Sequence, residues 1–395
     1  MTDNKLLKVF KWIFFVTTFL LLLFVIVFLF TGCVDKQELD ELTVVSGIAV
    51  DEGKSQDGGQ VPVLGELSIS VEFVTVSSEG TTGKDVKGKV LNLHGKNAFS
   101  ALRSAMNISQ NKLYLSHNQI LIFGRKLAEK GLNEHIDFFI RDYEARLNVP
   151  LLIADGEAGE ILQTKPEGVG LISEFLNNMA NVQSVQGLNV NTKMFDLVTN
   201  ISSWEKGTLI PLVKTSKEGE KTTLKIDETA AFVGDTMVGT LDGGQTRGVL
   251  WVMGLAKDGL INIETSQGQV VVEITGSKVD KKVEYKDKKL KVKIDILQSG
   301  VVGSATNGAG YNYDKNIEEI QNVTEKAIVS EIKKGYKKLA ELGCDVYGFG
   351  DWLRRNEPDQ WKEVVTNWDK FFKNIDFTIE VKSTIDNTGA LRKDI

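Results

Sequence analysis

The residue with the clearest capacity for covalent chemistry is Cys33. Two small residues, Thr31 and Gly32, precede its thiol at the end of a long apolar stretch. This order resembles the lipobox of bacterial lipoproteins, because the cleavage needs a small residue before the cut and the thiol then carries a diacylglycerol group. Phe30 stands where leucine is usual in that motif. The pattern predicts Cys33 as a lipid attachment site.

The stretch before this cysteine is uncharged over residues 12–30, and two threonines are its only polar side chains. As a helix it would extend roughly 28 Å, close to the hydrocarbon thickness of a bilayer. Lysines precede it, which orients its N-terminus toward the cytoplasm. It is longer than a usual signal-peptide core. Two interpretations therefore stay open: a cleaved lipoprotein signal peptide over residues 1–32, or a retained membrane anchor. Both place the remaining chain outside the cytoplasm.

Other residue types with metal or redox chemistry are sparse. If Cys33 carries lipid, Cys344 is left alone, and the chain can build neither a disulfide framework nor a cysteine-based zinc site. His94, His117 and His135 have no neighbours of ligand type at helical spacing. Nothing in the sequence argues for a metal, and we expect no cofactor.

Two glycine-containing motifs do not support nucleotide binding. "GEKT" (219–222) lacks the adjacent Gly-Lys pair of a phosphate-binding loop, and no strand–loop–helix context surrounds it. "GGQTRGV" (243–249) lacks the spacing of the dinucleotide fingerprint and is interpreted as a hairpin turn between strands. No nucleophile elbow, zinc-protease motif or EF-hand loop occurs in the chain.

Acidic side chains are plentiful, but spacing alone cannot place two of them across a cleft. Asp137, Asp142 and Glu144 lie near Arg141 and Arg146. We expect this group to form a solvated helix face followed by a turn.

The C-terminal aromatic residues could line a partner groove or a ligand shelf. Trp361 and Trp368 belong to an apolar stripe at helical spacing, which is more often typical of a core. The stretch "GCDVYGFGDW" (343–352) places glycines around aromatic residues and predicts a tight, packed corner between two helices. Cys344 in that corner would be a small buried hydrophobe.

The elements that must position these residues follow from hydrophobic periodicity. Strands are expected at 43–50, 66–76, 89–95, within 118–124, 147–155 and 222–242 (broken at Gly234), at 248–254, as a meander over 268–304, and at 375–385. Helices are expected from the cap Asn97 to about 106, within 125–132, at 133–142, at 156–163, at 314–342 ending before Gly343, and from Pro358 to about 372.

Composition places the chain among packed globular proteins. It has 395 residues, of which 42% are apolar and 25% charged, and this length fits two or three domains. The net charge of −6 argues against a nucleic-acid partner, which needs a basic face. We predict an α+β (mixed α/β) fold of three domains of mixed sheets with flanking helices. Their expected limits after the N-terminal segment are 33–203, a β-rich 204–265, and 266–395 with its long and Trp-rich helices.

Several stretches together resemble one family, the lipoprotein C subunits (Ger(x)C proteins) of the GerA-type germinant receptors of endospore-forming bacteria. The resemblance begins at "GCVDKQELDELTVVSGIAVDEG", where Val34 replaces a common tryptophan, and runs nearly to residue 385. Its further parts are "SHNQILIFGRKLAEKGL", "FFIRDYEARLNVPLLIADGEAGEIL", "GCDVYGFGDWLRRNEPDQW" and "WDKFF".

The resemblance implies a three-domain lipoprotein that is not an enzyme and is required for spore germination. It implies a location on the outer face of the spore's inner membrane, beside two integral-membrane receptor subunits that respond with it to small nutrients and trigger release of ions and dipicolinic acid. It also implies that a membrane subunit, rather than this chain, binds the nutrient. Cys33 is the one site residue that it carries over.

Two other classes of function remain open from the sequence. A substrate-binding lipoprotein that captures the nutrient would need a sizeable, mostly apolar cleft with convergent polar groups between domains. An envelope-anchored hydrolase would need perturbed carboxylates close together in such a cleft. The absence of a catalytic motif counts against the hydrolase.

Overall fold

A computed structural model of the chain divides into two compact units, residues 1–42 and 43–395. The residues that it describes are 3–30, 42–53, 67–77, 85–107, 109, 111–202, 206–219, 221–306 and 313–387.

The first unit contains helix α1 (Asp3–Phe30), which includes the apolar stretch expected to be helical. Its large apolar side chains are exposed, among them Phe10, Trp12 and Phe15. In the part of the chain that the structure describes, no helix is long and apolar enough to cross a membrane. Anchoring or cleavage of residues 12–30 stays a prediction.

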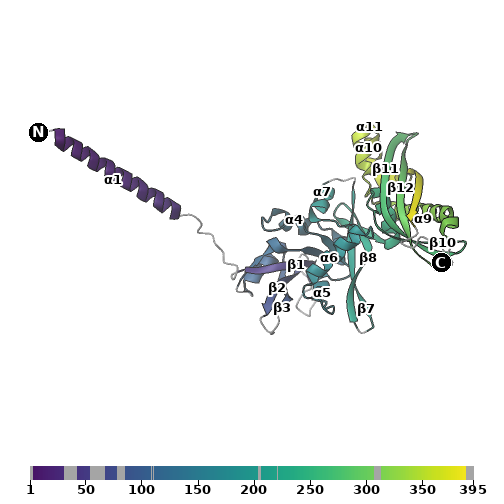
Figure 1. The fold of residues 1–395 in the computed structure, drawn as a ribbon, viewed down its shortest axis with the longest axis horizontal. Coiled ribbons are helices and arrows are strands. Elements are labelled where there is room, and N and C mark those ends of the chain that lie inside the picture. Colours follow the sequence, from purple (N-terminus) through teal and green to yellow (C-terminus); the bar gives the residue numbers. More distant parts are fainter. Residues whose placement is uncertain are drawn as a thin grey trace. The chain divides into compact units, whose positions relative to one another are not determined.

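The second unit begins with a nine-stranded mixed sheet of strand order β3-β2-β1-β5-β6-β7-β8-β9, with β4 pairing β1 (Figure 1). The central strands β1, β5, β6 and β7 are parallel, and antiparallel strands flank them on both sides. Every residue of β5 and β6 is buried, as expected for parallel strands that are covered on both faces. The strands are β1 (Leu42–Glu52), β2 (Leu67–Ser77), β3 (Asp85–Gly95), β4 (Lys112–Tyr114), β5 (Ile120–Gly124), β6 (Leu151–Ala154), β7 (Gly207–Glu218), β8 (Lys221–Val233) and β9 (Thr236–Asp242).

Helices cover both faces of this sheet. One face packs against α2, α3, α4 and α7, and the other packs against α5 and α6. The bounds are α2 (Ala98–Ser104), the 3-10 turns η2 (Ala105–Asn107) and η3 (Leu115–His117), α3 (Arg125–Lys130), α4 (Asn133–Arg141), α5 (Ala158–Gln163), α6 (Ile172–Val185) and α7 (Met194–Ile201).

A four-stranded sheet of order β10-β11-β12-β13 follows. The long hairpin of β11 and β12 turns at Asp287 and Lys288, which both have positive φ, and β13 returns parallel to β12 after a helical crossover. The elements are α8 (Gly243–Met253), β10 (Gly259–Thr265), β11 (Gly268–Lys286), β12 (Lys289–Ala305), α9 (Tyr313–Leu342), α10 (Phe349–Asn356), α11 (Pro358–Val364), η5 (Val365–Asn367), α12 (Trp368–Phe372) and β13 (Asp376–Asn387).

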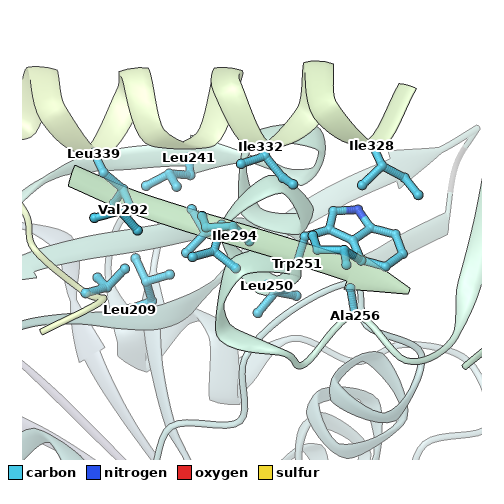
Figure 2. Packing of buried hydrophobic residues seen from close by; sticks show 14 of the residues in the cluster. Leu209, Leu241, Leu250, Trp251, Ala256, Val292, Ile294, Ile328, Ile332 and Leu339 are labelled. Carbon is cyan, nitrogen blue, oxygen red and sulfur yellow. The ribbon is translucent and has the colours of Figure 1, made fainter. Parts of the chain in front are cut away.

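One hydrophobic core joins this second sheet to the end of the first. Figure 2 shows Ile328 and Ile332 of α9 packed above Ile294 of β12, with Trp251 of α8 beside them. Leu241 of β9 belongs to the same cluster. Because this core contains residues from β7–β9 and from β10–β13, the two sheets share buried surface.

The interpretation of residues 243–254 as a hairpin turn and a strand is wrong. These residues form α8, whose first turn has a capping box: Asp242 accepts a hydrogen bond from the Gln245 N–H, and the Asp242 N–H donates to the Gln245 side chain. Gly254 ends the helix with a φ of +73°. A short apolar run that is buried throughout shows no periodicity that distinguishes a strand from a helix. The capping residues Asp242 and Gly254 are the sequence signal that identifies a helix here.

Other expected elements are confirmed. Asn97 caps α2, α9 ends before Gly343 at a φ of +66°, and Pro358 lies in the first turn of α11. The expected continuous helix to residue 372 is instead broken by η5. The mixed α/β class is confirmed. The nine-stranded sheet contains strands on both sides of residue 203, and the three-domain division stays a prediction.

Candidate functional site

The predicted lipid attachment site, Cys33, lies outside the described residues. The first described residue after it is Leu42, where β1 begins. The lipobox-like sequence therefore remains the evidence for this site.

The corner "GCDVYGFGDW" joins α9 to α10 as predicted. Cys344 is fully buried, and its Sγ donates a hydrogen bond to the Phe232 carbonyl of β8 at 3.1 Å. Burial raises the pKa of this thiol. A Cβ on Gly207 would approach Cys344 Sγ to 2.5 Å, so the corner needs glycine at the start of β7. The corner is a packed joint between the two sheets.

The predicted aromatic stripe is part of the core, as expected. We define the C-terminal aromatic cluster as Tyr336, Trp361, Trp368, Phe371 and Phe372. The Trp361 and Trp368 rings lie 5.3 Å apart, edge to face, and the Tyr336 hydroxyl donates to the Phe372 carbonyl at 2.6 Å. Phe372 is fully buried. The cluster therefore closes on itself and leaves no aromatic shelf at its centre.

The expectation of a solvated acidic group on α4 and the following turn is confirmed for Asp137, whereas Asp142 and Glu144 in the turn are half-buried. Asp137 and Arg141 form an exposed i,i+4 ion pair, and Glu144 pairs with Lys112 at 2.6 Å. The hydrogen bond to Glu144 raises the pKa of Lys112.

The histidines are dispersed over β3, η3 and α4. Burial lowers the pKa of His135. Among the described residues, no group of three His, Cys, Asp or Glu side chains is arranged to hold a metal ion. Residues Gly219 and Lys221 of "GEKT" connect β7 to β8 as a hairpin, and residue 220 lies outside the described part.

Two buried carboxylates on strands, which the sequence analysis missed, cap helices far along the chain. Asp51 of β1 accepts hydrogen bonds from the Ala158 and Gly159 N–H groups at 2.7 and 2.8 Å. Glu72 of β2 accepts from the first two N–H groups of α6, both at 2.8 Å. Carboxylates at helix N-termini satisfy unpaired donors and complement the helix dipole. These residues hold α5 and α6 onto the sheet.

A third buried carboxylate, Asp345, acts locally in the corner. Its oxygens accept from the Gly348 and Gly350 N–H groups at 3.0 and 2.8 Å, at the start of α10. Burial raises the pKa of Asp345 to about 7, although the hydrogen bonds oppose this shift. Asp345 shortly before Gly348 and Gly350 is a signal in the sequence for such a local cap, because aspartate in a turn often accepts hydrogen bonds from nearby backbone N–H groups.

A partly buried ion pair fixes the contact between α8 and α9. Arg247 Nε donates to Glu331 Oε2 at 2.9 Å, and a second Arg247 N–H contacts the other oxygen. The Trp251 indole donates to the same carboxylate at 3.0 Å. The helix backbones are so close that a Cβ on Gly248 would lie 2.0 Å from the Glu331 carbonyl. This arrangement is a rigid helix crossing.

A cavity with a volume of about 940 Å³ lies beside β3 and the end of α5. Lys89, Asn92, Gln163 and Lys165 contribute polar groups to it, and Glu72 reaches it with both oxygens already hydrogen-bonded to α6. It lies within the first sheet's layers rather than between the two sheets. This cavity is not the mostly apolar interdomain cleft that nutrient capture would need, and Asp345, the carboxyl with the raised pKa, does not line it.

Two family models of spore germination proteins match the two halves of the chain. The model of the spore germination protein N-terminal domain matches residues 35–215. The model of the spore germination B3/GerAC-like C-terminal region matches residues 227–389. Together the two matches extend over most of the chain in the expected order.

Relatives match over nearly their full lengths. Spore germination protein YndF of Bacillus subtilis (strain 168) is 23% identical over 92% of this chain and 94% of its own. Spore germination protein KC of the same organism is 24% identical over 94% of this chain and 95% of its own. The crystal structure of the GerBC protein is similar in fold, with a TM-score of 0.57 at 21% identity over 86% of this chain and 96% of that chain.

Proposed function

The chain belongs to the Ger(x)C family of spore germination proteins, and we propose that it is the lipid-anchored C subunit of a nutrient germinant receptor. The observation that carries this proposal is the match of both family models, in order, together with relatives aligned over more than nine-tenths of this chain. A single shared motif would support the proposal less strongly.

The proposed anchor is Cys33 on the outer face of the spore's inner membrane. One acyl chain binds a bilayer only marginally, whereas a lipoprotein's diacylglyceryl cysteine supplies at least two and is stable. Tethering raises the effective concentration of the folded unit beside its partners, so a modest interface suffices for assembly. The proposed partners are two integral-membrane receptor subunits.

In this proposal the chain works through protein contacts and performs no catalysis. The buried carboxylates Asp51, Glu72 and Asp345 support this assignment, because each is engaged with backbone N–H groups at a helix start. Nutrient recognition is assigned to a membrane subunit.

Deletion of the gene tests the proposal. Spores that lack this chain should lose dipicolinic acid release in response to the nutrient of one receptor, because that receptor is incomplete. The response to nutrients of the other receptors should be unchanged, and expression of the full chain should restore the lost response. A uniform loss of germination with all nutrients, or a general envelope defect, would contradict the receptor-subunit assignment.

A further inference from the structure

Aromatic and sulfur-containing side chains are exposed together on one face of the second unit. We define the α2–α4 patch as Phe99 on α2, Met106 on η2, Phe138 on α4 and Tyr143 just after α4. Phe99, Met106 and Tyr143 are 53%, 58% and 88% exposed. The Phe99 and Phe138 rings lie 6.2 Å apart, and all four residues surround one hollow of about 190 Å³. Exposed apolar groups gathered in this way mark an interaction surface.

The charges around the patch are balanced. Arg103 lies over the Phe99 ring, with its Cζ 5.0 Å from the ring centre. Lys112 is paired with Glu144, and Asp142 also lines the hollow. An acidic or basic partner surface would gain little here, so the patch favours an apolar or amphipathic occupant.

The patch lies close to the strand where the proposed anchor enters the fold. Lys112 and Leu113 of β4 line the hollow, and β4 pairs β1, which begins at Leu42. Residues 34–41 separate Leu42 from Cys33, and a chain of this length extends at most about 30 Å. A compact unit of roughly 350 residues has a radius of gyration of about 20 Å. A short tether therefore holds some face of the unit against the bilayer surface.

We propose that the α2–α4 patch contacts the lipid bilayer, with Phe99, Met106 and Tyr143 in the headgroup region. This inference rests on the proposed anchor at Cys33. Tyrosine suits the site because its ring is apolar while its hydroxyl stays hydrated, and the Tyr143 hydroxyl donates to Glu144 at the rim of the hollow. Balanced charge makes the contact depend on apolar insertion rather than on anionic lipid.

Thiol labelling of the full, lipidated chain tests this contact. Cys344 is buried and Cys33 is acylated in the proposal, so one introduced cysteine is the reactive thiol. Met106→Cys and Tyr143→Cys each receive an environment-sensitive fluorophore, and Leu297→Cys on the outer face of β12, 55% exposed, is the matched control. Each protein is reconstituted into phosphatidylcholine vesicles with and without nitroxide-labelled lipid.

The proposal predicts quenching about threefold stronger at positions 106 and 143 than at 297, unchanged by high salt. Equal quenching at all three positions, or none at 106 and 143 while the protein floats with the vesicles, overturns the inference and leaves the anchor intact. A fluorescence change at 106 and 143 that needs co-reconstituted membrane subunits assigns the patch to a protein partner and also overturns it. If the chain does not float with the vesicles and the fluorophore reacts with Cys33, the Cys33 thiol carries no lipid. That result overturns the anchor and with it this inference.

Discussion

The C-terminal aromatic cluster and the α2–α4 patch contain similar side chains in opposite environments. In the cluster, Phe372 is fully buried under Trp368 and Tyr336. In the patch, Phe99 and Tyr143 are left exposed at the rim of a hollow. The richer aromatic sequence forms the core, and the sparser one forms the surface that is available for contacts. Aromatic density along the chain is therefore a poor guide to the interaction surface.

Truncation in the cluster should give the largest effect on stability. Phe372→Ala removes a fully buried ring and should lower the free energy of unfolding by about 3–5 kcal/mol, as core phenylalanine truncations do. Urea unfolding of the full chain measures the loss. Phe99→Ala is the matched control in the patch. If Phe372→Ala and Phe99→Ala lowered the free energy of unfolding by similar amounts, the contrast between a buried cluster and an exposed patch would be wrong.

The corner next to the cluster should carry a pH dependence that the patch lacks. The pKa of Asp345 is raised to about 7 by burial, so the folded state holds this proton more tightly than the unfolded state. Protonated Asp345 therefore adds up to about 4 kcal/mol to the free energy of unfolding. This stabilisation is fully present below about pH 4 and is lost as pH rises to about 7. Asp345→Asn removes this titration.

The difference between wild type and Asp345→Asn isolates that contribution from other titrating groups. Between about pH 4 and pH 8, the free energy of unfolding of the wild type should fall relative to that of Asp345→Asn as pH rises, by up to about 4 kcal/mol. Parallel pH profiles would show that Asp345 does not titrate in this range. Asparagine has one acceptor oxygen instead of two, so in the variant the N–H of Gly348 or Gly350 loses its acceptor. This loss lowers the stability of the variant by the same amount at every pH.

Substitution in the patch should have the smallest effect on folding. Phe99→Ser combined with Tyr143→Ser should change the free energy of unfolding by less than about 1 kcal/mol, because both rings are largely exposed. The same double variant should lose the lipid contact at Met106→Cys in the labelling assay. A large destabilisation would mean that the patch is part of the core.

Local patterns predicted much of the fold. The 3.6-residue period over 314–342 and the alternation over 268–304 identified α9 and the β11–β12 hairpin, because in each the pattern is long and one face is buried. The run at 248–254 was misassigned because residues 248–252 of α8 are all buried, so this short apolar run shows no helical period. Helices α6 and α7 were not predicted.

The contacts that organise the interior could not be predicted from one sequence. Glu72 caps α6 from a strand one hundred residues away, and Asp51 caps α5 in the same way. Such pairings depend on strand order, which periodicity does not encode. The exposure of Tyr143 likewise depends on how α4 packs. Cys33, by contrast, is predicted by adjacent residues alone and needs no tertiary structure.

The most direct test of the account is the Cys33→Ala chain expressed at the wild-type level in spores that lack the native gene. Dipicolinic acid release is measured in response to the receptor's nutrient, with metabolic lipid labelling of the same protein. The account predicts loss of the lipid label and of the nutrient response, because the folded unit is no longer held at the membrane. Unchanged size, lipid labelling and response in this variant would contradict the lipid-anchored subunit.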